Sequence, residues 1–248
     1  MNSIQQGRPG LYVRRFLAAC GVLAVALATA ACGDSEADQR KAFIKFLDDI
    51  NQRTGVHFLM PGDADRAAFG DYMHHYTIIL DFNKDMKVIG AEYQDAMRKA
   101  GVDPGVQAQT LEQMVARRPM FPAMKAATNK TIDGFQSRLA RANAERAALK
   151  QPDDLKAVYA AAFDKLVTRP VEAMIASDRA LLAVLDSSEK IAGYADEHRA
   201  KLSIKGSQIR AADTRTQAEF NALIKAHQDA QKVFQEAQRN GDRVVNGR

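Results

Sequence analysis

The sequence has 248 residues, a formal net charge of +5 and only two cysteines, Cys20 and Cys32. Beyond Cys32 no thiol remains, which excludes a cysteine nucleophile, a redox pair and a thiolate metal site from the rest of the chain. Arg8, Arg14 and Arg15 are the only charged residues before Cys32, so removal of this leader lowers the net charge from +5 to +2. With no tryptophan and so small a charge, we expect no nucleic-acid partner.

Residues 1–31 have the pattern of a signal peptide. Arg14 and Arg15 precede a run of apolar and small residues from 16 to 31, which is shorter than the roughly 20 residues of a membrane-spanning helix. Residues 27–31, Leu-Ala-Thr-Ala-Ala, resemble a bacterial lipobox, and this resemblance predicts Cys32 as the lipidated residue. Cys20 follows a closer local match but lies too near Arg15 for an apolar segment to precede it. An ordinary secretory signal and an uncleaved anchor are the alternatives.

Lipidation at Cys32 would hold the protein on a membrane without a spanning helix. Each buried methylene of an acyl chain such as palmitate contributes about 0.8 kcal/mol, and lipoproteins of this type carry three chains. Gly33 follows the cysteine in place of the aspartate that favours inner-membrane retention. We therefore expect an outer-membrane location facing the periplasm, with the membrane as one partner and an envelope protein as a possible second.

Apolar residues recur at helical spacing along nearly all of the chain beyond Cys32. Thr54-Gly55 ends the first helix, Pro61-Gly62 marks a turn, and residues 101–105 interrupt the helical pattern after the second helix. Pro119 and Pro122 predict an end or kink, and Pro170 predicts a break between two later helices. The helices are expected over about residues 35–53, 63–99, 111–118, 123–150, 153–168, 171–194 and 216–239.

One segment departs from the helical period. Residues 202–209 alternate around Lys205-Gly206, which predicts a small β-hairpin supported by the helices. Thr216 to Glu219 has the form of a capping box for the last helix. The fold class is therefore all-α, a bundle of about six helices with one short hairpin before the last. We predict a signal peptide over 1–31, a lipid-anchored helical domain over 32–239 and a flexible tail over 240–248.

Three stretches resemble the YiaF-like lipoproteins, a family of Gram-negative envelope proteins of unknown function. The first is Cys32-x-Asp34-x-Glu36-x-Asp38-Gln39-Arg40-Lys41-Ala42-Phe43-Ile44-x-Phe46-Leu47, and the others lie within 149–170 and 219–224. The resemblance implies a helical lipoprotein. It carries over no catalytic residue.

Histidines and carboxylates offer one candidate metal site, at His57, Asp71, His74 and His75. Adjacent histidines on a helix point about 100° apart, so only Asp71 and His75 have a useful spacing. Two ligands are too few for a tight site, and we predict no metal and no cofactor.

Candidates for catalysis are equally weak. His227 lies on an apolar stripe without an assignable acid, and Ser187-Ser188 lacks a glycine-flanked turn. Asp48-Asp49 and Asp153-Asp154 are adjacent pairs rather than carboxylates facing each other across a cleft, and the second pair is placed to stabilise a helix N-terminus. We predict no catalytic residue.

The most basic region comprises Arg117, Arg118, Lys125, Lys130, Arg138, Arg141 and Arg146. It is either a surface for anionic headgroups or a solvated helix face. The function predicted from the sequence is a non-catalytic structural or interaction module of the cell envelope. A helical bundle with a pocket for a lipid or other apolar ligand is the alternative, and an envelope hydrolase is a weaker one.

Overall fold

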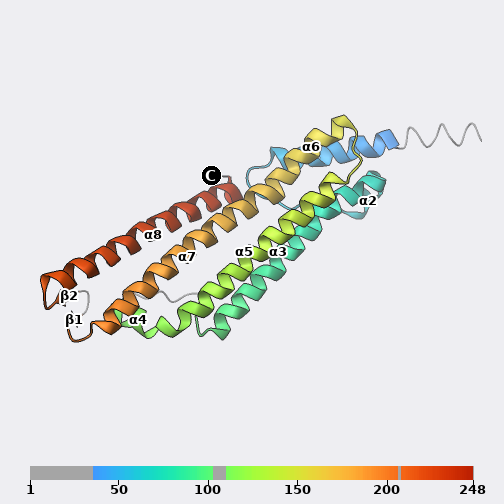
Figure 1. Cartoon of the computed structure of the whole chain (residues 1–248). Coiled ribbons are helices and arrows are strands. Elements are labelled where there is room, and N and C mark those ends of the chain that lie inside the picture. The colour runs from blue at the N-terminus through green and yellow to red at the C-terminus, as the bar shows by residue number, and fades with distance from the viewer. Residues whose placement is uncertain (1–35, 103–109, 206–207, 248) are drawn as a thin grey trace, which may run out of the picture. The chain divides into compact units, whose positions relative to one another are not determined.

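A computed structural model describes residues 36–102, 110–205 and 208–247. The predicted signal peptide, the predicted lipidation residue Cys32 and residues 103–109 lie outside the described residues. Almost all of the described chain is helical (Figure 1). Six of the described helices are eleven residues or longer, and a two-stranded hairpin precedes the last, so the predicted fold class is confirmed. No described helix is long and apolar enough to cross a membrane.

The first helix covers residues 36–52 and ends before Gly55. The later elements are α2 (Asp63–Phe69), η1 (Gly70–Tyr72), α3 (Met73–Lys99), α4 (Leu111–Ala116), η2 (Arg118–Met120), α5 (Phe121–Ala147), α6 (Asp153–Phe163), η3 (Asp164–Thr168), α7 (Arg169–Glu197), β1 (Leu202–Lys205), β2 (Gln208–Ala211) and α8 (Thr214–Asn246).

The described chain falls into two compact units. The smaller unit contains residues 36–46 and Met60–Met73, and it is built around aromatic rings. Phe43 packs edge-on against Phe69 with centroids 5.4 Å apart and stacks on Tyr72 at 6.0 Å, while the hydroxyl of Tyr72 donates to Glu36. These contacts join the start of the first helix to α2 and η1 within this unit.

The larger unit contains residues 47–59 and all described residues from 74 onward. Helix α7 is its central element, because it packs against both α5 and α8 and also contacts α4 (Figure 1). Around its C-terminal end, Ile191 and Ala195 form an apolar cluster with Leu111 of α4, Leu202 of β1 and Phe220 of α8. The hairpin therefore packs on the helices, as expected for two strands that would be marginal alone.

Pro170 does not separate two helices, so the predicted break at this residue was wrong. Helices α6 and α7 are joined without interruption through η3, one turn of π-helix. Proline has no N–H to donate four residues back, so the backbone immediately before it cannot keep the regular α-helical ladder. The wider turn accommodates the proline without ending the helix. Pro119 and Pro122 do mark a boundary, since the short η2 separates α4 from α5 there.

Helix α8 differs from the sequence prediction at both ends. Its N-cap is Asp213, whose carboxylate accepts from the backbone N–H of Thr216 at 2.7 Å, so the capping box at Thr216 was wrong. At the other end α8 continues to Asn246, through most of the segment expected to be a flexible tail. The reason lies in its contact with the 53–56 turn: Val56 N–H donates to the carbonyl of Val245 at 2.8 Å.

Candidate functional site

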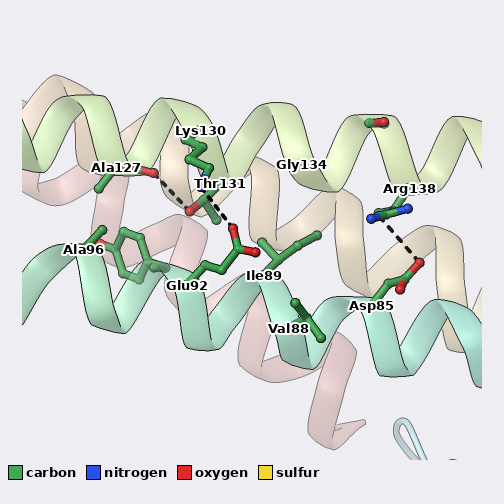
Figure 2. A pocket seen from close by; sticks show the side chains of 12 residues that line it. Asp85, Val88, Ile89, Glu92, Ala96, Ala127, Lys130, Thr131, Gly134 and Arg138 are labelled. Atoms are coloured by element: carbon green, nitrogen blue, oxygen red, sulfur yellow. Dashed lines mark hydrogen bonds and ion pairs between the residues drawn. The ribbon is translucent and has the colours of Figure 1, made fainter.

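A groove of about 290 Å³ runs between α3 and α5 in the larger unit (Figure 2). Its floor is apolar and narrow because Gly134 of α5 faces Ile89 of α3; a Cβ on Gly134 would lie 3.4 Å from the Ile89 side chain. Val88 stands on its rim with 51% of its surface exposed. The lining residues are Asp85, Val88, Ile89, Glu92, Tyr93, Ala96, Ala127, Lys130, Thr131, Gly134, Ser137 and Arg138.

Two ion pairs cross this groove. Lys130 Nζ lies 3.0 Å from Glu92 Oε2, and Arg138 Nε lies 3.5 Å from Asp85 Oδ2 (Figure 2). Each acid comes from α3 and each base from α5, and the residue numbers run in opposite directions, so the two helices are antiparallel. Val88 and Gly134 lie between the two pairs. The groove thus has one acidic wall, one basic wall and an apolar centre.

Helix geometry explains this pattern. Residues 85, 88, 89, 92 and 96 recur at three and four and share one face of α3, as do 127, 130, 131, 134 and 138 on α5. The buried threonine of this set satisfies its own hydroxyl, since Thr131 Oγ1 donates to the carbonyl of Ala127 at 3.0 Å. The groove therefore presents no unpaired hydroxyl from Thr131 to a ligand.

Tyr93, which lines the groove, also belongs to a polar cluster with Thr128 of α5 and Asp178 of α7. Burial raises the pKa of Tyr93, a side-chain hydrogen bond with Thr128 acts against that rise, and the charge of Asp178 adds to it. Burial also raises the pKa of Asp178, to about 6. No motif singled out Asp178. In the sequence, Asp178 is an aspartate among the apolar residues of a long helix. Many exposed aspartates have the same sequence environment, so this pattern does not identify Asp178 as a functional residue.

The candidate histidine cluster contains one buried, hydrogen-bonded histidine, His75, and one exposed histidine, His74. His75 is buried, its Nδ1 lies 3.2 Å from the side-chain nitrogen of Gln151, and its backbone carbonyl accepts from the Tyr159 hydroxyl at 2.8 Å. Burial, followed by the nearby His74, lowers the pKa of His75. His74 is exposed. Among the described residues no three His, Cys, Asp or Glu side chains are grouped so that they could hold a metal ion.

His227 and Ser187, which were weighed separately in the sequence, meet between α8 and α7. Ser187 Oγ lies 2.8 Å from His227 Nδ1 and donates to the carbonyl of Val184 at 2.8 Å. Burial lowers the pKa of His227. Ser187 and Lys190 line a second hollow of about 340 Å³, and the sequence Ser187-Ser188-Glu189-Lys190 places them in Ser-x-x-Lys spacing. The serine lies inside a continuous helix, where neighbouring backbone N–H groups are used by the helix, so the pair fits an interhelical hydrogen bond better than a nucleophile.

The basic region is distributed over ion pairs between helices. Lys125 of α5 bridges Asp186 and Glu189 of α7 at 3.0 and 2.6 Å, and Arg118 lies 2.9 Å from Asp196. Lys130 and Arg138 pair with α3 across the groove. Most of these bases therefore face carboxylates of a neighbouring helix, which favours the solvated-face interpretation over an uncompensated positive patch.

The geometry defines a helical protein with a surface groove whose two walls carry opposite charges. The chain belongs to the family described as "Protein of unknown function (DUF3053)", whose model matches residues 20–241. It is similar to "Uncharacterized protein YiaF" of Escherichia coli (strain K12), 25% identical over 223 residues that cover 90% of this chain and 93% of that protein. The protein of the same name from Shigella flexneri gives the same values. No solved structure matches. The predicted YiaF-like family of unknown function is confirmed.

Proposed function

We propose that this protein is a lipid-anchored, non-catalytic interaction module of the bacterial cell envelope. Cys32 would carry the lipid and hold the protein in the outer membrane, facing the periplasm. The leader over residues 1–31 and the lipobox-like residues before Cys32 support this address. The first helix is described from residue 36, so only a few residues separate it from the proposed anchor.

The observation that carries the proposed interaction is the groove between α3 and α5. It combines an exposed valine with two ion pairs that reach the surface. The side chains of Lys130 and Glu92 are 76% and 55% exposed, and those of Arg138 and Asp85 are 42% and 32% exposed. Exposed ion pairs contribute only about 0–1 kcal/mol to stability, so these charges are not needed for the fold and are free to engage a partner. A partner helix would find an apolar centre with charge on both sides, the arrangement of many protein interfaces.

A ligand pocket has weaker support. The two hollows of about 290 and 340 Å³ lie at the lower end of the range of roughly 300–1,000 Å³ for small-molecule sites. Both are shallow surfaces between helices rather than enclosed cavities, and neither would bury a diacyl lipid. Lipid capture is therefore kept as an outcome of the test.

The test is in-cell photo-crosslinking of the full-length protein. A photoreactive residue replaces Val88 in the groove or, as a matched control, Val233 of α8, which is equally exposed at 56%. We expect a discrete protein adduct from position 88 and none from position 233. Equal labelling from both positions, or a lipid adduct alone at position 88, would contradict the proposal.

The proposed anchor is tested separately with Cys32→Ala. This variant is expected to lose membrane association and to migrate as an unprocessed or soluble chain. Unchanged membrane association and size would contradict lipidation at Cys32.

A further inference from the structure

The groove is self-complementary in charge, because its acidic and basic walls carry opposite charges at the same positions along the helix axes. Asp85 is level with Arg138 and Glu92 with Lys130, while Val88 and Gly134 share the level between these pairs. Arg141, the next base along α5, is also influenced by the charges of Asp85 and Asp81. The acidic wall of α3 and the basic wall of α5 therefore extend over several turns in opposite chain directions.

Two kinds of two-fold axis can place a second copy of this chain on the groove. An axis perpendicular to the helices sets α3 against α3 of the second copy, so acid meets acid and base meets base. An axis parallel to the helices sets α3 against α5 of the second copy, so acid meets base. Like charges placed opposite each other across an interface are unfavourable, and the walls of the groove thus select the parallel axis.

Rotation about the parallel axis also leaves the position of each residue along the groove unchanged. Asp85 then faces Arg138 of the second copy, Glu92 faces Lys130, and Val88 faces Gly134. The exposed valine of each copy then lies over the apolar centre of the other groove, where Gly134 faces Ile89. Each intramolecular ion pair becomes a four-charge cluster at the interface.

The size of the face suits a stable dimer. Helices α3 and α5 each contain 27 residues. At 1.5 Å per residue and about 10 Å per helix, a contact along the full length of both helices would cover at most roughly 40 by 20 Å, or about 800 Å². Stable protein interfaces bury about 800 Å² on each partner.

We infer that the α3–α5 groove is the interface of a parallel two-fold dimer and that its occupant is a second copy of this chain. The inference rests on the proposed function, since it names the partner of the same surface. The parallel axis places corresponding residues of the two copies at the same level along the helices, which is compatible with two copies anchored by Cys32 in one membrane.

The experiment measures the mass of the crosslinked product and the mass of the purified protein, and compares each with the mass of one chain. Full-length protein with the photoreactive residue at position 88 should give an adduct of twice the chain mass that contains only this protein. Purified in mild detergent and studied by light scattering with the detergent mass subtracted, the wild-type protein should be a dimer. Val88→Glu should be a monomer, while the equally exposed control Val233→Glu should stay a dimer.

A charge exchange divided between two chains separates the interface from folding. Asp85→Arg alone should weaken the homodimer at least tenfold, because it repels Arg138 in both copies. Mixing this variant with an Arg138→Asp chain should restore a dimer, because each new side chain then faces an opposite charge on the other chain while the pair within each chain stays broken. A monomeric wild-type protein, or a Val88→Glu variant that remains dimeric, would overturn the inference. If position 88 crosslinks to a different protein, the dimer fails while the proposed function stands. If it crosslinks to no protein, both fail.

Discussion

The ammonium group of Lys165 joins two parts of the larger unit. It donates to the carbonyls of Ile50 at 2.9 Å and Asn51 at 3.1 Å, and also to that of Arg53. These carbonyls belong to the end of the first helix, where a helix leaves its last four carbonyls without intrahelical partners. Lys165 itself lies in η3, so its side chain ties the end of the first helix to the junction of α6 and α7.

The size of this contribution follows from opposing effects. A hydrogen bond to a charged group contributes about 1.5–3 kcal/mol, and a cation at a helix C-terminus adds about 0.3–1 kcal/mol. Burial lowers the pKa of Lys165, so desolvation of the ammonium offsets part of this gain. We expect Lys165→Met to lower the free energy of unfolding by about 2 kcal/mol, because methionine keeps the packing of the stem and removes only the donor.

Urea unfolding followed by far-ultraviolet circular dichroism measures this loss. With the mature chain carrying Cys32→Ser and a slope of about 3 kcal/mol per M, the midpoint should fall by roughly 0.7 M. Lys156→Met, at an exposed lysine of α6, is the matched control and should leave the midpoint nearly unchanged. If the two variants shift the midpoint equally, the argument from the three carbonyls is refuted.

The remaining predictions concern two ionisable groups, His227 and Asp178, and two glycines, Gly55 and Gly90. Burial lowers the pKa of His227 below the value of about 6.5 in the unfolded chain, so the protein should lose stability as pH falls below about 6.5. His227→Gln should flatten that part of the urea-midpoint profile, and an unchanged profile would contradict it. The pKa of Asp178 is raised to about 6, so ionisation destabilises the fold as pH rises from about 4 to 6. Asp178→Asn should raise the free energy of unfolding by about 1–2 kcal/mol at neutral pH, after allowance for partial exposure, with no gain near pH 4 as the check. Gly55→Ala should cost about 2 kcal/mol, since φ is +74° and the new Cβ would lie 2.6 Å from the Val245 carbonyl. Gly90→Ala, with no atom within 4 Å of its Cβ, should instead raise the thermal midpoint, and a loss there would count against the reasoning.

Local patterns in the sequence were sufficient for the fold class. The spacing of Leu155, Tyr159 and Phe163 predicted α6, and all three are fully buried. Alternation around Lys205-Gly206 predicted the hairpin, which pairs Leu202 with Ala211. These features depend on residues close together in sequence, where period and turn chemistry are informative.

The features that failed depend on partners distant in sequence. Pro170 predicts a break because proline interrupts the hydrogen bonds of an isolated helix, whereas α6 and α7 are continuous through the π-helical turn η3. The meeting of Ser187 with His227, and the facing of Gly134 with Ile89, need the relative placement of helices that one-dimensional periodicity does not contain. The candidate groove was therefore not predictable as a site, although Lys130 and Arg138 had been noted for their charge.

The contact between the 53–56 turn and the end of α8 has a consequence for the order of folding. Gly55 and Gly247 both have positive φ, and their backbones approach so closely that neither position has room for a Cβ. This seal joins segments far apart in sequence, so it cannot form until α8 has been synthesised, and long-range contacts of this kind form slowly. The larger unit therefore cannot be completed before the last residues of α8 are available to the 53–56 turn.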